Sequence, residues 1–194
     1  MAYVSNAEYK NRIDLFSKLN RVASVFHNAN RKLKPMSPID LNDEDVFRFL
    51  KSLERLNVKY LLVGGFAMAF HGYVRATHDL DLWVKDDAEN IQQLKKALTE
   101  NGVEGLDQMR SFEMIPGFTQ FHVGDSGFVV EPLKSLKVLN SFDFASCYER
   151  AESGEYNGLH FKVIHAKDLL KEKEGSNRPK DQGDIEHLRS MDIG

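Results

Sequence analysis

Residues 60–84 read YLLVGGFAMAFHGYVRATHDLDLWV, and the fold that we expect for the chain follows mainly from them. The apolar, partly β-branched run Tyr60–Val63 predicts a buried strand, which Gly64-Gly65 ends. Alanines within Phe66–Phe70 favour a short helix that Gly72 can close. Glycines at such a turn let the backbone approach a ligand, and the helix start offers unpaired N–H groups to an anion. The stretch therefore predicts a strand-turn-helix unit suited to a phosphate group.

Polar and apolar residues then alternate from Thr77 to Lys85. In a strand with this pattern, Asp79, Asp81 and Trp83 share one face, while the leucines and the valine between them share the other. Two like charges on one face repel each other unless water or a cation neutralises them, and Mg²⁺ is the oxygen-seeking cation available in cells. Considered without the glycine turn, the two aspartates could simply be solvated acids at a strand edge. The adjoining glycine turn favours a site for a nucleotide and a metal.

Two separated patterns carry a resemblance to a known family. The stretch around the glycines and aspartates has the form VGGxAxxxHGxxRxTxDxDxWV, and residues 173–188 have the form KxxxxRPKDxxDIxxL. Both resemble motifs of minimal nucleotidyltransferases of the DNA polymerase β superfamily, particularly the bacterial branch of AbiEii-type toxins. The resemblance implies an α+β nucleotidyltransferase fold, with a mixed sheet flanked by helices. It also implies transfer of a nucleoside monophosphate from an NTP to a hydroxyl group.

The same resemblance implies a two-metal site. Asp79 and Asp81 would hold two Mg²⁺ ions, and Glu131 would supply the third carboxylate. The family usually has an aspartate at this third position, so Glu131 is one methylene longer. Pro132 directly after it also removes a backbone donor. The predicted catalytic residues are Asp79, Asp81, Glu131 and Lys173.

A nucleotide site is expected beside these carboxylates. The residues that the resemblance assigns to it are Gly64, Gly65, Arg75, Thr77, Lys173, Arg178, Lys180 and Asp181. Independently of the resemblance, three cations near a helix start could bind a triphosphate, with Asp181 and Asp184 orienting them. The alternative is a solvated helix end in which Lys180 pairs with Asp184.

Composition sets wider bounds on the 194 residues, of which 42% are hydrophobic and 28% charged. These values are typical of one globular domain with an extension. The single cysteine, Cys147, allows no internal disulfide and suits a reducing cytoplasm. No apolar run approaches the roughly 20 residues of a membrane span, so we expect neither insertion nor secretion. The net charge of −3 argues against a protein that coats nucleic acid indiscriminately.

The charge is unevenly distributed, because residues 1–35 hold seven Lys or Arg against two acids. This segment therefore carries +5 and the remainder −8. Apolar residues at spacings of three and four predict an amphipathic helix within 7–33, with an inward stripe of Tyr9, Ile13, Phe16, Leu19, Ala23 and Phe26. We divide the chain into a basic helical extension, 1–35, and a nucleotidyltransferase domain, 41–194. The extension could cap the core, form a dimer contact or face RNA.

The remaining elements follow from local patterns. We expect helices over 42–57, 86–101, 142–151 and 166–174, and strands over 118–123, 127–131 and 159–164.

Several functional alternatives stay open at this stage. The acceptor could be an RNA end such as that of tRNA, a protein side chain or a small molecule. The branch resemblance implies a toxin with an antitoxin partner. A catalytically degenerate nucleotide- or RNA-binding module and a metal-dependent hydrolase are the rival classes.

Overall fold

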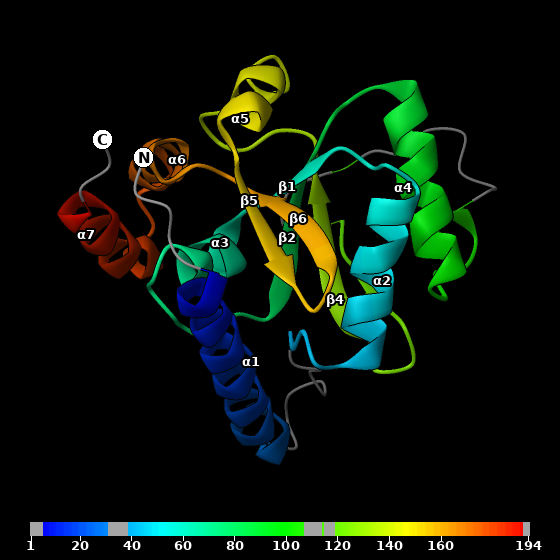
Figure 1. Cartoon of the computed structure of the whole chain (residues 1–194), viewed down its shortest axis with the longest axis horizontal. Helices are drawn as coiled ribbons and strands as arrows, with labels where there is room; N and C mark the ends of the chain where they lie inside the picture. The colour runs from blue at the N-terminus through cyan, green and yellow to red at the C-terminus, as the bar shows by residue number, and fades with distance from the viewer. Residues whose placement is uncertain (1–5, 31–38, 107–113, 115–118, 192–194) are drawn as a thin grey trace.

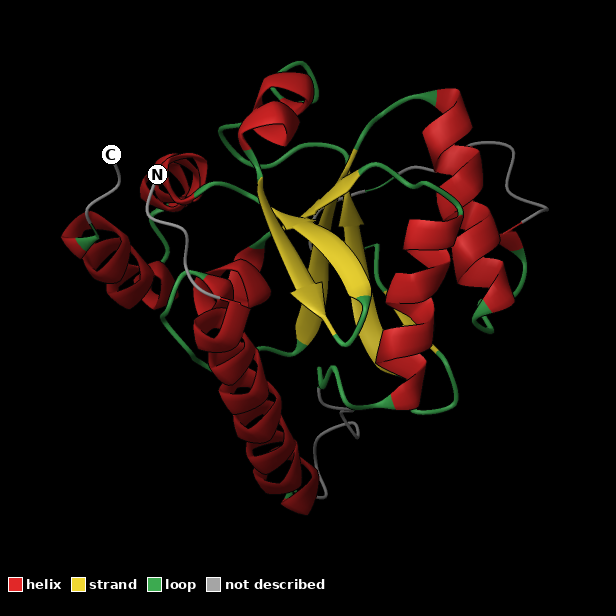
Figure 2. Cartoon of the chain, viewed as in Figure 1, coloured by secondary structure: helices red, strands yellow, loops and turns green. Residues whose placement is uncertain are grey.

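A computed structural model describes residues 6–30, 39–106, 114 and 119–191. The described chain forms one mixed sheet in the order β3-β4-β2-β1-β6-β5, flanked by helices (Figure 2). The strands are β1 (Tyr60–Leu62), β2 (Asp79–Val84), β3 (Phe121–Val123), β4 (Phe128–Leu133), β5 (Glu152–Tyr156) and β6 (Leu159–Val163). The helices are α1 (Asn6–Ala29), α2 (Glu44–Arg55), α3 (Gly64–Phe70), α4 (Ala88–Glu100), α5 (Phe144–Arg150), α6 (Ala166–Ser176) and α7 (Gln182–Ser190), with a 3₁₀ turn, η2 (Pro179–Asp181).

The helices fall into two groups about the sheet (Figure 1). Helices α2 and α4 lie side by side in contact, whereas α1, α3, α6 and α7 lie on the opposite side in that view. Local capping explains where two of them begin. Asp43 accepts the N–H groups of Asp45 and Val46 at the start of α2, and Asp87 accepts that of Asn90 near the start of α4. The predicted α+β architecture, a mixed sheet flanked by helices, is confirmed.

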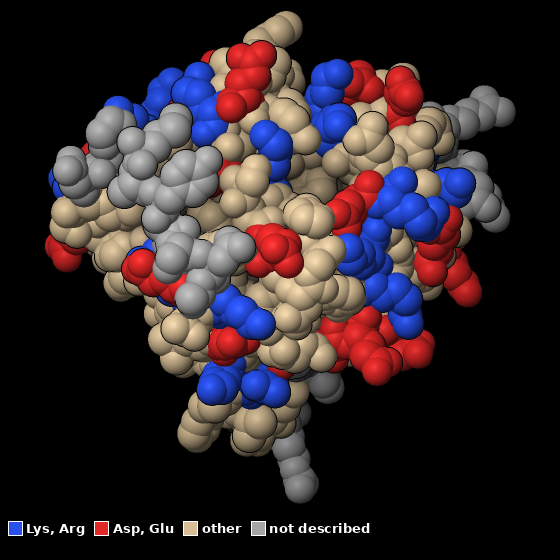
Figure 3. Space-filling view, viewed as in Figure 1, with Lys and Arg blue, Asp and Glu red and all other residues tan. Residues whose placement is uncertain are grey.

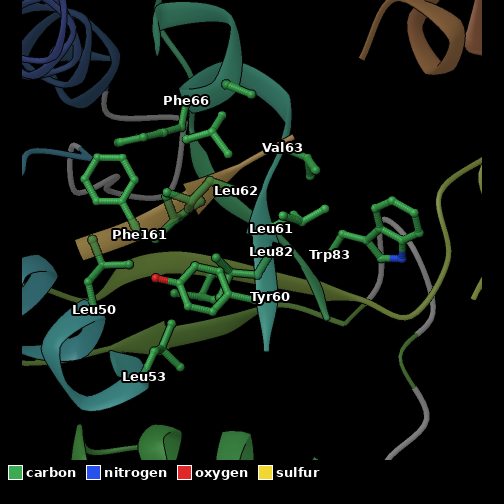
Figure 4. Close-up of a cluster of buried hydrophobic side chains, with 14 of the residues drawn as sticks. Leu50, Leu53, Tyr60, Leu61, Leu62, Val63, Phe66, Leu82, Trp83 and Phe161 are labelled. Atoms are coloured by element: carbon green, nitrogen blue, oxygen red, sulfur yellow. The ribbon is translucent and has the colours of Figure 1, made fainter. Parts of the chain in front are cut away.

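Strand β2 lies near the middle of the sheet, antiparallel to β1 and parallel to β4. Its leucines are fully buried, and Leu82 lies on the same side of β1 as Leu50, Leu53 and Tyr60 (Figure 4). The aspartates occupy the opposite face, as the alternation predicts. Trp83 shares their face and is buried, and its indole N–H donates to the Lys134 carbonyl at 3.1 Å. One face of β2 therefore belongs to the core and the other leads into the site.

Strand β5 was not among the predicted elements. It forms an antiparallel hairpin with β6, in which Tyr156 pairs with Leu159. The two residues between them, Asn157 and Gly158, both have positive φ, +51° and +77°. This is the Asn-Gly turn that most strongly favours a tight hairpin. Strand β5 completes the edge of the sheet against which the start of α1 packs.

The first half of α1 packs into the core through Tyr9, Ile13 and Phe16. The predicted continuation of this apolar stripe is wrong at Phe26, which is 75% exposed. Beyond Phe16 the buried side of the helix is polar, with Ser17, Asn20 and Ser24. The helix meets backbone groups of residues 39–41 and 77 there, and buried backbone groups need hydrogen-bond partners rather than apolar contacts. The predicted residues 1–5 and 31–35 of the extension lie outside the described chain.

No helix in the described ranges is both long and apolar enough to cross a membrane.

Candidate active site

Three carboxylates from two neighbouring strands converge at the candidate site. The parallel register of β2 and β4 sets Asp81 opposite Glu131, with Asp79 two residues before it. One oxygen from each of Asp79, Asp81 and Glu131 lies within 4.8 Å of the others. Three carboxylates so close together form the hard oxygen donor set that Mg²⁺ or Mn²⁺ takes. The three predicted metal ligands therefore lie where a divalent cation fits.

The environment of Asp81 resists its ionisation. Burial, followed by the negative charges of Asp79 and Glu131, raises the pKa of Asp81 to about 8. Lys173 and Lys180 act in the opposite direction. A divalent cation among the carboxylates would reverse this balance, because it stabilises their charged forms.

The longer side chain at Glu131 is accommodated without a break in the strand. Pro132 lies within β4 opposite Leu82 of β2, while β3 pairs only with residues 128–130. Pro132 is therefore beyond the end of β3, where β4 needs no backbone donor on that side. The Gln120 side-chain amide donates to Glu131 Oε2 at 3.2 Å. Glu131 is 7% exposed, so its carboxylate is held inside the site.

The Gly64-Gly65 turn is shaped by its contacts with β2. Gly64 has a φ of +57°, and a Cβ added there would lie 1.7 Å from Asp81 Oδ2. A Cβ added at Gly65 would lie 2.7 Å from the Thr77 Cβ. Thr77 in turn donates its hydroxyl to Asp79 Oδ1 at 3.0 Å. Gly64 thus leaves room for the Asp81 carboxylate against the backbone, and Gly65 leaves room for Thr77, the hydrogen-bond donor to Asp79.

The second predicted motif forms a buried ion network around Lys173. The Lys173 Nζ atom lies 2.9 Å from Asp181 Oδ1 and 2.7 Å from Asp184 Oδ2, and both aspartates are fully buried. Arg75 makes a two-pronged pair with Asp184, with N–O distances of 2.8 and 3.0 Å. Arg178 Nε lies 2.7 Å from Asp181 Oδ2. Three cations therefore share two carboxylates.

This network agrees in part with the first arrangement considered for the motif, because Asp181 and Asp184 hold Lys173 and Asp181 also holds Arg178. Asp184 pairs with Arg75 and Lys173, so the alternative pair between Asp184 and Lys180 is not the one formed. Burial opposes ionisation of Asp181, but hydrogen bonds from Arg178, Ser176 and Lys173 lower its pKa well below the usual range. Burial opposes ionisation of Asp184 as well, and its bonds to the cations lower its pKa. Both aspartates are therefore charged partners of the cations.

One cavity of about 620 Å³ joins the two groups of charges. It is lined by all but one of the predicted site residues: Gly64, Gly65, Arg75, Thr77, Asp79, Asp81, Glu131, Lys173, Arg178 and Lys180. Asp181 is the exception, because it lies buried behind the cations that it pairs with. Lys180 is exposed and adds a positive charge at the cavity wall.

Sequence reasoning missed a loop that forms another part of the cavity wall. Ser135, Leu136 and Lys137 line the cavity, and Glu172 of α6 holds this loop. The Glu172 carboxylate accepts the backbone N–H groups of residues 137, 138 and 139 at 2.7, 2.8 and 3.2 Å. No periodicity or motif marks such a contact between segments 35 residues apart.

Comparison with known proteins agrees with part of the predicted resemblance. Residues 45–116 match the family model of aminoglycoside-2''-adenylyltransferase, a range that contains the glycine turn and both aspartates but not Glu131. The match supports a relationship to the nucleotidyltransferase superfamily, and it does not confirm the AbiEii-type branch. Among solved structures, the chain is similar to an antigenic nucleotidyltransferase-like protein from Paracoccidioides brasiliensis, with 20% identity and a TM-score of 0.49 over 80% of this chain and 78% of that one. No curated protein matches the chain.

Proposed function

We propose that this protein is a divalent-metal-dependent nucleotidyltransferase, which transfers a nucleoside monophosphate from an NTP to a hydroxyl acceptor and releases pyrophosphate. The observation that carries the proposal is the convergence of Asp79, Asp81 and Glu131 in a cavity that Lys173, Arg178 and Lys180 also line. An NTP needs both kinds of surface. Its metal ions require oxygen ligands, and its phosphates require cations.

Each group has a distinct part in this proposal. Asp79, Asp81 and Glu131 would hold two Mg²⁺ ions, which when bound would activate the acceptor oxygen and stabilise charge at the reacting phosphorus and the leaving group. Arg178 and Lys180 would bind the phosphates by charge-assisted hydrogen bonds. Lys173 has three N–H donors and uses two for Asp181 and Asp184, which leaves one for a phosphate in the cavity that it lines. Gly64 and Gly65 would let a phosphate approach the backbone.

For the acceptor we favour a small molecule with hydroxyl groups, on the strength of the family match. The matched family adenylylates aminoglycosides by its name, and a cationic acceptor of that kind suits an acidic cavity wall. The face seen in Figure 3 gives RNA little uniform attraction, because the basic side chains of α2 lie among acidic ones. Arg48 pairs with Asp45 there, and Arg55 pairs with Glu100. An RNA acceptor, with a toxin role and an antitoxin partner, is the second candidate and rests on the AbiEii-type motif resemblance.

The experiment supplies each α-³²P-labelled NTP with Mg²⁺ or EDTA to the full chain. Separate reactions contain an aminoglycoside mixture, total cellular RNA or cell protein. We expect label in one acceptor, dependent on Mg²⁺ and lost in the variant that carries both Asp79→Asn and Asp81→Asn. Glu174→Gln is the matched control, because Glu174 lies on α6 but pairs with Arg189 and does not line the cavity.

The outcomes separate the proposal from its rivals. Release of free NMP without a labelled acceptor would favour a hydrolase. NTP binding without turnover in any reaction would favour a degenerate binding module. Full activity in the double variant would refute the metal assignment.

A further inference from the structure

Helix α1 reaches the candidate site through one buried amide. Asn20 is 1% exposed, and its Oδ1 atom accepts the backbone N–H of Thr77 at 2.9 Å. Its Nδ2 atom donates to the Ile39 carbonyl at 3.0 Å. The orientation of the amide is fixed, because rotating it by 180° would set a donor against a donor and an acceptor against an acceptor. Asn20 therefore connects α1 to the segment that enters β2.

Thr77 needs this support because it lies outside the strand ladder. Strand β2 begins at Asp79, so the Thr77 N–H has no strand partner, and Asn20 supplies the acceptor instead. The side chain of Thr77 packs against Gly65 on the other side, where an added Cβ would lie 2.9 Å from its Oγ1 atom. Thr77 is thus fixed both through its backbone and through its side chain.

The fixed hydroxyl of Thr77 in turn orients a candidate metal ligand. It donates to Asp79 Oδ1 at 3.0 Å, which restrains the rotation of that carboxylate. Groups that hydrogen-bond a metal ligand orient it and tune its affinity for the ion. The contacts therefore run without interruption from Asn20 through Thr77 to Asp79.

We propose that Asn20 is a positioning residue for Asp79, acting through Thr77, and that α1 is consequently an integral part of the metal site. The inference rests on the proposed function, since it presumes that Asp79 binds a cation. It also gives the N-terminal segment a role distinct from capping the core, joining a second copy or facing RNA.

Ser17 provides a matched control on the same helix. It is fully buried, and its hydroxyl accepts the Leu41 N–H at 3.2 Å. Ser17→Ala therefore removes one buried hydrogen bond between α1 and residues 39–41 without touching Thr77. Asn20→Ala removes a similar bond to Ile39 and also the bond to Thr77.

The test measures Mn²⁺ affinity of the full chain by electron paramagnetic resonance, with Mn²⁺ standing in for Mg²⁺ at oxygen ligands. Loss of a partner that orients a ligand typically weakens metal affinity about 10- to 100-fold. We expect Thr77→Val to weaken Mn²⁺ affinity about 10-fold, Asn20→Ala about 3- to 10-fold and Ser17→Ala less than about twofold. Thr77→Ser, which keeps the hydroxyl, should retain most of the affinity. The Asn20→Ala, Thr77→Val double variant should match Thr77→Val alone, because both changes break one relay.

The inference would be overturned if the losses of Mn²⁺ affinity from Asn20→Ala and Thr77→Val add up in the double variant. It would also be overturned if Asn20→Ala and Ser17→Ala lose Mn²⁺ affinity equally. A wild-type protein that binds no Mn²⁺ would overturn the proposed function together with it, whereas normal wild-type binding with additive effects would overturn the inference alone. If Asn20→Ala does not fold, Asn20→Ser takes its place in the same double-mutant comparison.

Discussion

Replacing Asp81 by asparagine should stabilise the metal-free protein, although Asp81 lies at the centre of the candidate site. The substitution keeps the shape of the side chain beside Gly64 and removes its charge. Burial and the charges of Asp79 and Glu131 raise the pKa of Asp81 to about 8 from an ordinary 3.8. At pH 7 the wild-type carboxyl must therefore take up a proton on folding, whereas asparagine does not.

The size of the effect follows from the pKa. Taking up this proton costs about 1.4 kcal/mol for each pH unit above the ordinary pKa, or about 4 kcal/mol at pH 7. Asp81 is partly open to the cavity, so water screens part of this penalty. We expect a measured increase in unfolding free energy of about 1–3 kcal/mol.

The pH dependence has a definite sign. A carboxyl whose folded-state pKa is raised binds a proton on folding, so wild-type stability should fall as pH rises from about 4 to about 8. The advantage of Asp81→Asn should therefore be small near pH 4, grow across this window and then level off. Urea denaturation in EDTA at several pH values, followed by circular dichroism, measures it. A variant no more stable than wild type at pH 7, or an advantage independent of pH, would refute this account of the site.

Asp184→Asn is the control with the opposite sign. Asp184 is buried with a lowered pKa because of its bonds to Arg75 and Lys173. Its contribution to stability is present above about pH 4 and is lost as pH falls further. Removing the charge leaves two cations short of a partner, which should cost about 3–5 kcal/mol at pH 7.

Added Mg²⁺ should raise the stability of wild type and leave that of Asp81→Asn nearly unchanged.

Three further predictions concern other parts of the cavity. Glu131→Ala should lower turnover about 100-fold while NTP affinity stays similar, and Glu131→Asp should keep part of the activity; steady-state kinetics and calorimetry separate the two effects. Gly64→Ala should abolish Mn²⁺ binding because its Cβ would meet Asp81 Oδ2, whereas Gly127→Ala, also at positive φ but with open space around it, should lose only about 1–2 kcal/mol of stability. Lys180→Ala should weaken NTP binding by about 1.5–3 kcal/mol in titration calorimetry without changing the melting temperature. Lys173→Met, in contrast, should destabilise the fold by about 3–5 kcal/mol in urea. Equal losses of stability in Lys173→Met and Lys180→Ala would contradict the distinction between a buried and an exposed cation.

Local sequence patterns predicted the centre of the fold well, because there the pattern and the tertiary structure demand the same thing. The alternation in Asp79–Val84 matches a strand with one core face and one cavity face. The run Tyr60–Leu62 is buried throughout, as an apolar strand in mid-sheet should be. Glycine is required at position 64 both because the backbone has a positive φ there and because a Cβ would collide with Asp81.

Prediction failed where a distant segment decides the local structure. Strand β5 has a polar sequence, and its pairing is set by the Asn157-Gly158 turn and by β6. An Asn-Gly pair directly before the predicted strand 159–164 is the signal that could have indicated a partner strand over residues 152–156. In α1, apolar spacing alone placed Phe26 inward, whereas the backbone groups near Thr77 and Ile39 favoured Asn20 at the buried position.

The residues of the candidate site were likewise predictable only where a local pattern determines them. The two aspartates two residues apart were readable from the strand period, whereas the position of Glu131 came from the family resemblance alone. The ion network was only partly foreseen, since the contact between Arg75 and Asp184 joins residues 109 positions apart. The residue types of the C-terminal motif suggested anion binding, but only the fold could determine which cation each buried aspartate neutralises.

The distribution of charge in that network bears on how the cavity could hold an NTP. Asp181 and Asp184 offset two of the three cations that they contact, so this network keeps a net single positive charge, and Lys180 adds a second at the cavity wall. On β2, burial and the negative charges of Asp79 and Glu131 oppose ionisation of Asp81 while no cation balances them. The carboxylates would repel a triphosphate that bound without metal ions, and the basic side chains would repel a cation that bound without a nucleotide. A nucleotide bound together with its metal ions satisfies both walls at once, and we therefore expect NTP and Mn²⁺ each to increase the affinity of the protein for the other.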